Sequence, residues 1–273
     1  MSAVKVRLKT LLRHVSLWKT LCVNLRLFPL KTALKFPVLC GRRLDIAGLR
    51  RGAVRLVGEP YMGAIVLGIS PTPRFSTKGL WTLVRISRGG SLTCGPGFVV
   101  RSGASLVVTG RMECGEDVLV NQRALVSCQK AMTIGAHTRI GWDAQVLDSD
   151  CHLIYREDKD RVYLPYKPVV IGRNVWIASR VNVGKGAVIP DYSIVGRGSF
   201  LNKDFGDVKT RGNVFVGSPA VLRATGCYRL LDIPLEIRVS KELKNSDREW
   251  FSPSELGVDV EAALNPPPHR GMA

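Results

Sequence analysis

Residues 171–201 read IGRNVWIASRVNVGKGAVIPDYSIVGRGSFL. From the first of them onward, an aliphatic residue recurs at every sixth position. The members of this column are Ile171, Ile177, Val183, Ile189, Val195 and Leu201. A second column of small or β-branched residues follows each member after four positions: Val175, Val181, Ala187, Ser193 and Ser199. The period of six is neither the 3.6 of an amphipathic helix nor the simple alternation of a half-buried strand.

The same spacing extends toward the amino terminus, through Ile134, Ile140 and Val146, although the step from Val126 to Ile134 is eight residues. Six extended residues span about 20 Å, less the corner. Three such edges close into a triangular coil, and successive coils pair at about 4.8 Å. Glycine often follows the aliphatic residue, which we interpret as freedom to adopt positive φ at a tight corner. The pattern predicts an all-β solenoid, a parallel β-helix, and disfavours a β-sandwich.

Residue composition and periodicity divide the chain into three parts. We predict a basic helical amino-terminal segment over 1–41, a β-helix over 42–225, and a carboxy-terminal extension over 226–273 with a loose tail. Within 5–35, one predicted helix face is apolar: Leu8, Leu11, Leu12, Val15, Trp18, Cys22 and Leu25. The opposite, polar face carries Thr10, Arg13, Thr20 and Asn24. Such a helix either caps the rest of the protein or lies on an anionic membrane surface.

The repeat breaks off between residues 147 and 170, where a charged excursion leaves the predicted scaffold. Excursions of this length from a rigid scaffold commonly carry function. This one begins with Asp148, Asp150 and His152 in alternation. In an extended segment these three side chains would leave the same face, so a carboxylate would be able to fix the imidazole tautomer. The same geometry would also suit a metal, which we do not expect here.

These motifs resemble those of the hexapeptide-repeat acyltransferases, whose fold is a left-handed β-helix. The resemblance rests on the hexads, on the Asp148-x-Asp150-x-His152 loop, on the stretch Asn174-Val175-Trp176-Ile177, and on Gly217-Ser218-Pro219-Ala220. It is specific over about 115–225 and weaker over 42–114. The nearest branch contains the galactoside and maltose acetyltransferases and the O-acetyltransferases of capsule and exopolysaccharide synthesis. The resemblance implies acetyl-CoA as acyl donor, a sugar hydroxyl as acceptor, and a homotrimer with sites between subunits.

The resemblance assigns the general base to His152, because a histidine pKa near neutrality suits proton removal from an attacking hydroxyl. Asp148 and Asp150 are the candidate partners of that imidazole. We do not expect Cys151 to act as a nucleophile, because it and its neighbour His152 would point to opposite faces of an extended chain. His137 falls within a hexad, where we expect a coil corner without a role.

The resemblance also supplies the binding residues. Asn121 matches the asparagine that contacts the acceptor, although an asparagine ladder inside the solenoid is the alternative. Trp176 matches the aromatic residue beside the acyl donor, and the alternative interpretation is that its ring packs under the loop. The donor groove maps onto Ala178, Ser179, Arg197, Asn202, Lys203 and Arg223. Three of these depart from the family's usual residues: Ala178, Arg197 and Asn202. We expect Lys203 in particular to meet CoA phosphates.

Composition limits the partners. The 273 residues carry a net charge of +18, which attracts anionic lipid, nucleic acid or phosphate-rich ligands. No nucleic-acid-binding motif accompanies the charge, so we expect no such partner. The seven cysteines are widely spread without CxxC pairs, which predicts reduced thiols in the cytosol and no zinc site. We expect a cytoplasmic protein and, if the acceptor is lipid-linked, peripheral contact at the inner membrane face.

Other functions remain in competition. A non-catalytic β-helix scaffold is the main rival from another class, and acetylation of a free sugar or a small xenobiotic is the rival within the class. A carbonic anhydrase would need more histidines on facing coils. A nucleotidyltransferase would need a glycine-rich nucleotide motif before the solenoid.

Overall fold

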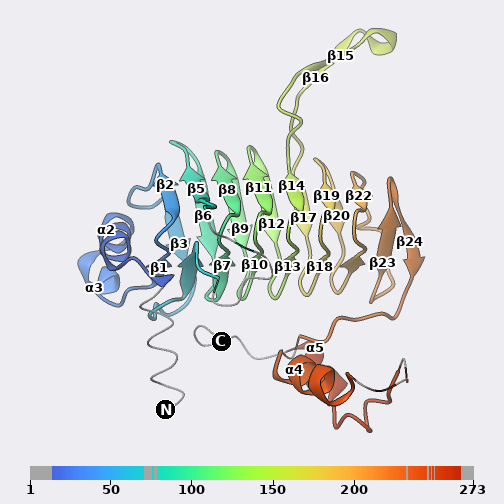
Figure 1. The fold of residues 1–273 in the computed structure, drawn as a ribbon. Coiled ribbons are helices and arrows are strands. Elements are labelled where there is room, and N and C mark those ends of the chain that lie inside the picture. The colour runs from blue at the N-terminus through green and yellow to red at the C-terminus, as the bar shows by residue number, and fades with distance from the viewer. Residues whose placement is uncertain are drawn as a thin grey trace, which may run out of the picture.

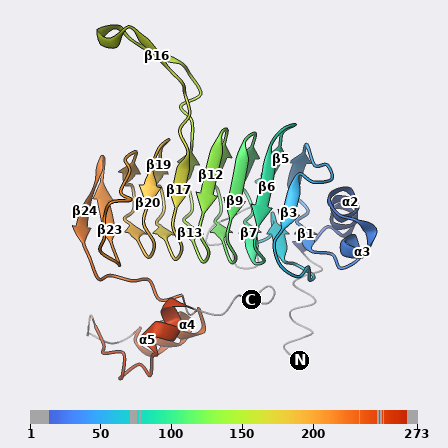
Figure 2. The same ribbon diagram turned by 180° about the vertical axis from the view of Figure 1, so that it is seen from behind.

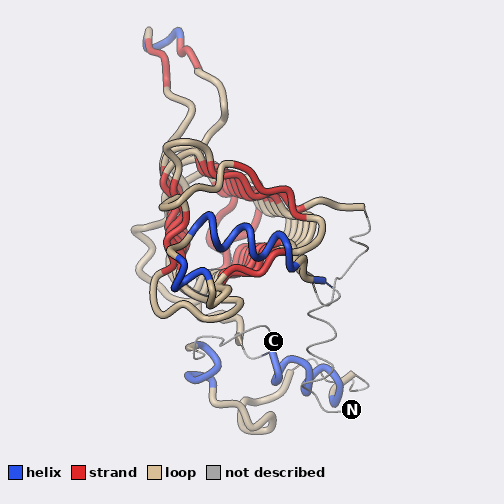
Figure 3. The backbone as a smooth tube through the Cα atoms, turned by 90° about the vertical axis from the view of Figure 1, so that its left-hand side faces the viewer, coloured by secondary structure: helices blue, strands red, loops and turns tan. Residues whose placement is uncertain are grey.

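The computed structural model describes residues 14–70, 76, 79–231, 233–244, 246, 248 and 250–265. Its body is a solenoid of three parallel sheets, which run side by side along one axis (Figure 1). Seen down that axis, the coils superpose as a triangle (Figure 3). The prediction of an all-β solenoid is confirmed.

Successive strands of the chain pass to successive sheets. The first sheet orders β1 (Val38–Cys40), β4 (Ile65–Leu67), β7 (Phe98–Val100), β10 (Leu119–Val120), β13 (Arg139–Ile140), β18 (Trp176–Ile177), β21 (Ile194–Val195), β23 (Val214–Gly217) and antiparallel β24 (Ala220–Ala224). The second orders β2 (Leu44–Ala47), β5 (Thr82–Ile86), β8 (Ser105–Val108), β11 (Leu125–Cys128), β14 (Gln145–Leu147), β19 (Asn182–Val183) and β22 (Phe200–Leu201).

The third sheet orders β3 (Val54–Leu56), β6 (Ser91–Cys94), β9 (Arg111–Cys114), β12 (Ala131–Ile134), β17 (Val169–Ile171) and β20 (Val188–Ile189). The chain turns at three edges of the prism. We call the turn from the first to the second sheet the first edge, the turn from the second to the third sheet the second edge, and the return to the first sheet the third edge. These edges position the candidate site.

The two predicted columns form the core. Every member of the six-residue column from Ile171 to Leu201 is at most 1% exposed, and so is every member of the second column. Register partners lie 20 residues apart in the coils that directly precede the excursion, as in Leu119 with Arg139, and 18 residues apart after it, as in Trp176 with Ile194. The eight-residue step from Val126 to Ile134 therefore belongs to a regular, longer coil rather than to an isolated bulge.

The interpretation of the glycines that follow the aliphatic column is wrong. The positive φ values fall two residues later, at His137 (59°) and Asp143 (59°), while Gly135 and Gly141 are not among the residues with positive φ. A Cβ added to Gly141 would lie 2.6 Å from the carbonyl carbon of Ala178 on the next coil. These glycines are small because the next coil's backbone presses against them.

Two helices, α2 (Leu17–Leu27) and α3 (Leu30–Ala33), cover the amino-terminal end of the solenoid (Figure 3). The prediction of which face of α2 packs on the protein is wrong. Asn24, on the predicted polar face, is fully buried and Thr20 is 4% exposed, whereas Trp18, on the predicted apolar face, is 73% exposed. The cause is the unpaired edge of β1. Asn24 accepts from the Val38 N–H at 3.0 Å and donates to the Val38 carbonyl at 2.8 Å, and Thr20 Oγ1 accepts from the Cys40 N–H at 3.1 Å. The polar side chains supply the hydrogen bonds that a further strand would give.

The other predicted apolar positions of that helix, Leu8, Leu11 and Leu12, lie outside the described residues. The carboxy-terminal extension contains α4 (Ile233–Glu242) and α5 (Val260–Leu264), which lie to one side of the coils (Figure 2). Tyr192, on the third edge, donates from its hydroxyl to Asn265 Oδ1 at 2.7 Å. This contact ties the end of α5 to the solenoid. None of the described helices is long and apolar enough to cross a bilayer.

Candidate active site

The excursion leaves the second edge after β14 and forms a hairpin that projects away from the coils (Figure 1). Its strands are β15 (Ile154–Arg156) and β16 (Arg161–Tyr163), joined by the short helix η1 (Glu157–Lys159). The root is closed by backbone hydrogen bonds, from Asp150 N–H to the Pro165 carbonyl at 2.9 Å and from Lys167 N–H to the Asp148 carbonyl at 3.0 Å. The residues just beyond this root are therefore held at the solenoid surface.

Asp148 is fully buried, and its carboxylate is used by the backbone. Its two oxygens accept three N–H groups of the preceding coil, from Gln129 at 2.7 Å, Lys130 at 2.8 Å and Ala131 at 2.9 Å. Charge-assisted bonds of this kind are strong, and they fix the point where the excursion begins. Asp148 is thus an anchor of the hairpin root and does not serve as a partner of the imidazole, contrary to the sequence prediction.

The alternation argued from sequence is not adopted. Cys151 has φ of 64°, so the chain reverses its twist between Asp150 and His152 and their side chains do not share an extended face. The Asp150 carboxylate forms an ion pair with Lys185 Nζ. Cys151 Sγ accepts a hydrogen bond from Gln129 Nε2 at 3.3 Å. His152 itself is exposed.

The predicted acceptor and donor residues lie in part along the first edge. The N–H of Asn121 donates to the Ile140 carbonyl at 2.9 Å, and the N–H of Ala178 donates to the Val195 carbonyl at 3.0 Å. These bonds place Asn121 one coil before Ile140, and Ala178 with Ser179 and then Arg197 on the two coils after Ile140, all along one edge. Trp176, two residues before Ala178 on β18, points outward and is 38% exposed.

The remaining predicted residues lie elsewhere. Asn202 and Lys203 follow β22 and therefore sit on the second edge, with Lys185 and the root of the excursion. At ~3.3 Å per residue, the face of the second sheet separates the two edges by about 13 Å. Arg223 is on β24, at the carboxy-terminal end of the solenoid. One chain thus carries the candidate base on one edge and the candidate acceptor residue on another.

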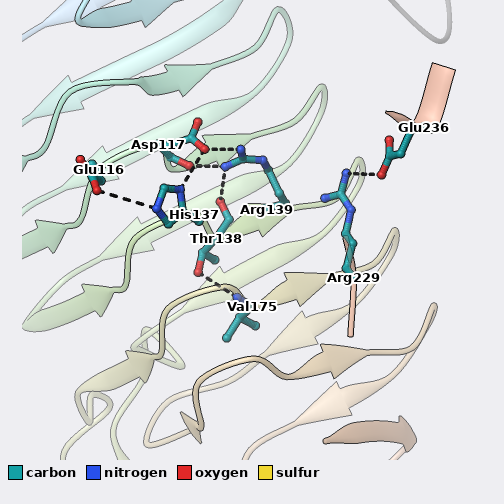
Figure 4. Close-up of polar contacts among 8 residues, drawn as sticks. All are labelled: Glu116, Asp117, His137, Thr138, Arg139, Val175, Arg229 and Glu236. Atoms are coloured by element: carbon teal, nitrogen blue, oxygen red, sulfur yellow. Dashed lines mark hydrogen bonds and ion pairs between the residues drawn. The ribbon is translucent and has the colours of Figure 1, made fainter. Parts of the chain in front are cut away.

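A buried polar cluster occupies the third edge and the first sheet (Figure 4). His137 Nδ1 lies 3.1 Å from Asp117 Oδ2, and His137 Nε2 lies 3.7 Å from Glu116 Oε1. Arg139 donates both to the Asp117 carbonyl and to its carboxylate. His137 is 9% exposed and sits in a corner, as predicted, where it links neighbouring coils.

The carboxy-terminal extension adds an arginine that sequence reasoning missed. Arg229 places its guanidinium carbon 5.4 Å from the ring centroid of Trp176, and its Nη2 lies 3.5 Å from Glu236 on α4. Burial lowers the pKa of Arg229, and the nearby charge of Arg139 lowers it further. Arg229 lies beyond the repeat, where no sequence periodicity indicated a position.

Arg101, on the first edge one coil before Asn121, was missed as well. Burial lowers its pKa, and the charge of Arg139 contributes. In the part of the chain that the structure describes, no group of three or more His, Cys, Asp or Glu side chains is arranged to hold a metal ion. All seven cysteines are free thiols.

Comparison with known proteins supports the resemblance to the hexapeptide-repeat acetyltransferases over part of the chain. Ninety residues of the chain are 30% identical to the galactoside O-acetyltransferase of Escherichia coli (strain K12). The match covers 33% of this chain and 44% of that enzyme, so the chain spans less than half of the relative it matches. No protein-family model matches the chain.

Parts of the chain are similar in structure to solved proteins of low sequence identity. The polySia-specific acetyltransferase NeuO is 17% identical, with a TM-score of 0.44 over 79% of this chain and 91% of that one. The hexapeptide-repeat-containing acetyltransferase VCA0836 of Vibrio cholerae O1 biovar eltor, complexed with acetyl coenzyme A, is 22% identical. Its TM-score is 0.36 over 54% of this chain and 68% of that one.

Proposed function

We propose that this chain is an acetyl-CoA-dependent O-acetyltransferase of the hexapeptide-repeat kind, which acetylates a sugar hydroxyl of a surface-polysaccharide precursor. One observation carries the proposal: His152 is exposed at the root of the excursion. His137, by contrast, is buried against Asp117, and His14 is partly buried. His152 is thus the described histidine best able to meet a substrate. The sequence similarity to a galactoside O-acetyltransferase supports the same activity.

In this reaction His152 removes the proton of the acceptor hydroxyl as that oxygen attacks the thioester carbonyl. The new carbon–oxygen bond forms, the carbon–sulfur bond breaks, and the proton passes from the imidazolium to the departing CoA sulfur. Transfer is direct, without an acyl-enzyme. Asp148 contributes indirectly, because its three backbone contacts hold the root from which His152 projects.

For acetyl-CoA we propose four residues on or beside the first edge: Trp176, Ala178, Ser179 and Arg197. For the nucleotide part of the donor we propose Asn202 and Lys203 on the second edge and Arg223 on β24. Arg197 and Lys203 are cations suited to phosphate contacts. Arg229 joins this set through its position over Trp176. Asn121 is proposed to bind the acceptor sugar.

We further propose a homotrimer with sites between subunits. The division of the candidate residues between two edges supports it, since a neighbour's first edge set against the second edge would bring Asn121 and Trp176 to His152. The hairpin supports it as well, because a lone two-stranded hairpin is marginal in water. Its apolar side chains Leu153, Tyr155, Val162 and Leu164 are each 58% exposed or more, which suits contact with another subunit.

Cytosolic location with peripheral contact at an anionic membrane is also part of the proposal. Leu17 and Leu25 are 68% and 42% exposed on the outer side of α2, beside the exposed cation Arg26. Apolar groups flanked by cations suit an anionic lipid surface. Flotation with phosphatidylglycerol vesicles tests this contact. The Leu17→Ser/Leu25→Ser variant should lose binding, whereas Ile237→Ser on α4 should keep it.

The activity is tested by acetyl-CoA turnover, followed through free-thiol release with a panel of sugars and sugar nucleotides. Wild type should release thiol in a sugar-dependent manner, and His152→Ala should lose roughly 100-fold to 10,000-fold of that rate. His14→Ala is the matched control and should retain full turnover. Absence of turnover with every acceptor, together with absence of saturable acetyl-CoA binding, would favour a non-catalytic scaffold.

A further inference from the structure

A groove of about 690 Å³ lies between α2 and the first coil, and neither Leu17 nor Leu25 lines it. Its size is that of a small-molecule site rather than of a packing defect. The helix contributes Trp18, Lys19 and Arg26, the coil contributes Asp45, and Trp81 stands at the other wall. We call it the tryptophan groove.

Two indole rings stand exposed at this groove, Trp18 at 73% and Trp81 at 60%. Lys19 Nζ lies 5.2 Å from the ring centroid of Trp81, and it donates to the Leu44 carbonyl at 2.7 Å and to the Arg42 carbonyl at 3.0 Å. These bonds hold the ammonium group beside the second indole. Trp81 is therefore positioned although it faces solvent, which lowers the ordering cost of binding.

The chemistry of the lining suits a saccharide. Indole faces pack against the apolar C–H faces of sugar rings, while Asp45, Lys19 and Arg26 offer an acceptor and donors for hydroxyl groups. A purely apolar ligand would leave the charged groups of the lining unpaired on burial, at a free-energy cost.

One wall of the groove, Trp81, lies on the same edge of the prism as the proposed acceptor site. Trp81 comes just before β5 and so lies on the first edge, as do Arg101 and Asn121 on the next two coils. At ~4.8 Å per strand spacing, about 10 Å separates the coil of Trp81 from that of Asn121. An extended chain of a few sugar units would span this distance along the edge.

We propose that the tryptophan groove binds the remote units of an extended saccharide whose acetylated unit lies at Asn121. The inference rests on the proposed acetyl transfer to a sugar. It makes the natural acceptor an oligosaccharide or polysaccharide chain rather than a free monosaccharide or a small xenobiotic.

The test compares saccharide ladders of glucose, galactose, N-acetylglucosamine and sialic acid, each from monosaccharide to hexasaccharide. Wild type should show a lower KM for the hexasaccharide than for the monosaccharide of the sugar that it acetylates. Trp18→Ala and Trp81→Ala should raise the hexasaccharide KM by roughly five- to tenfold, leaving kcat with the monosaccharide and the KM for acetyl-CoA unchanged. Trp250→Ala is the matched control, because Trp250 is also 73% exposed but lies in the carboxy-terminal extension.

Binding of the same hexasaccharides to the full chain, measured by calorimetry without acetyl-CoA, separates the groove from the reaction. Binding that Trp81→Ala weakens and Trp81→Phe restores supports the groove even if thiol release fails and the proposed activity falls. Equal KM for short and long acceptors, or tryptophan variants that match wild type, would overturn the groove while leaving the transferase intact. Loss of phosphatidylglycerol-vesicle binding in the tryptophan variants, with saccharide binding unchanged, would assign the surface to membrane instead.

Discussion

Arg229 lies over the indole ring of Trp176, with its guanidinium carbon 5.4 Å from the ring centroid. The two residues come from different parts of the chain, Trp176 from a central coil and Arg229 from the extension that follows the solenoid. The extension thereby reaches the face proposed to hold the acyl donor, and it brings a partly desolvated cation there.

Arg229→Ala should therefore raise the KM for acetyl-CoA by roughly three- to tenfold, since it removes both a contact that orients Trp176 and a nearby positive charge. Steady-state kinetics at saturating acceptor would measure this. Arg248→Ala is the matched control, because Arg248 lies over Trp250 in the same extension, at 5.8 Å, away from the coils. A KM that is unchanged or lower in Arg229→Ala would mean that the arginine does not assist donor binding.

Asp148→Asn should destabilise the fold by about 2–4 kcal/mol, because the amide presents a donor to backbone N–H groups that need an acceptor. Urea denaturation followed by circular dichroism would give the free energy of unfolding. Asp150→Asn is the control, since Asp150 is about half-exposed in its pair with Lys185 and such pairs contribute little. Equal stabilities of the two variants would show that Asp148 does not anchor the root.

Gly141→Ala should destabilise the fold by about 3 kcal/mol, because its Cβ would lie 2.6 Å and 2.7 Å from backbone atoms of Ala178 and Ser179. Gly198→Ala, on the same edge, meets nothing within 4 Å and costs only the strain of φ at 72°, about 1 kcal/mol. Thermal unfolding of both variants provides the comparison. A smaller loss for Gly141→Ala than for Gly198→Ala would contradict the close coil contact.

Stability should fall at alkaline pH because of the buried thiols. Burial raises the pKa of Cys40 and of Cys94 to about 12, from an ordinary value of 9.0. A group whose pKa is raised in the folded chain stabilises the fold fully below its unfolded pKa and loses that contribution as the pH rises through the folded value. The loss should therefore develop between about pH 9 and pH 12, as measured by the melting temperature.

Alkylation with iodoacetamide gives an independent check on the same thiols. In the folded chain at pH 8, Cys151 and Cys227 are exposed and should react, while the buried Cys94 should not. Peptide mass spectrometry would read the sites, with urea-unfolded protein as the positive control. Rapid labelling of Cys94 in the folded chain would contradict its burial.

The sequence predicted the core well because the inward direction of a strand residue is a local property. An aliphatic residue at every sixth position can be read without knowing which coil lies beside it, and Ile171 and Leu201 are buried as predicted. The triangular coils follow from that pattern, and the break in the pattern marks the excursion that carries His152.

Contacts between different coils, and between the coils and other segments, could not be predicted from the local sequence pattern. Asp148 accepts N–H groups from a turn about 18 residues earlier, and Asn24 pairs with the free edge of β1, which no local pattern encodes. The alternation of Asp150 and His152 was inferred from an extended backbone that the positive φ of Cys151 breaks. Arg229 belongs to a segment without periodicity, so its approach to Trp176 required the structure.

The change from 20 to 18 residues per coil has an evolutionary consequence. Ile134 and Ile171 are register partners 37 residues apart, across the excursion, and both are buried. Register between coils is thus set strand by strand, so each side chain keeps its inward or outward direction when a turn changes length. Gene segments encoding whole coils can then be duplicated or lost, and turns can be lengthened or trimmed, without exchanging core and surface. Length variation among natural variants of this chain should therefore fall in the turns or amount to complete coils.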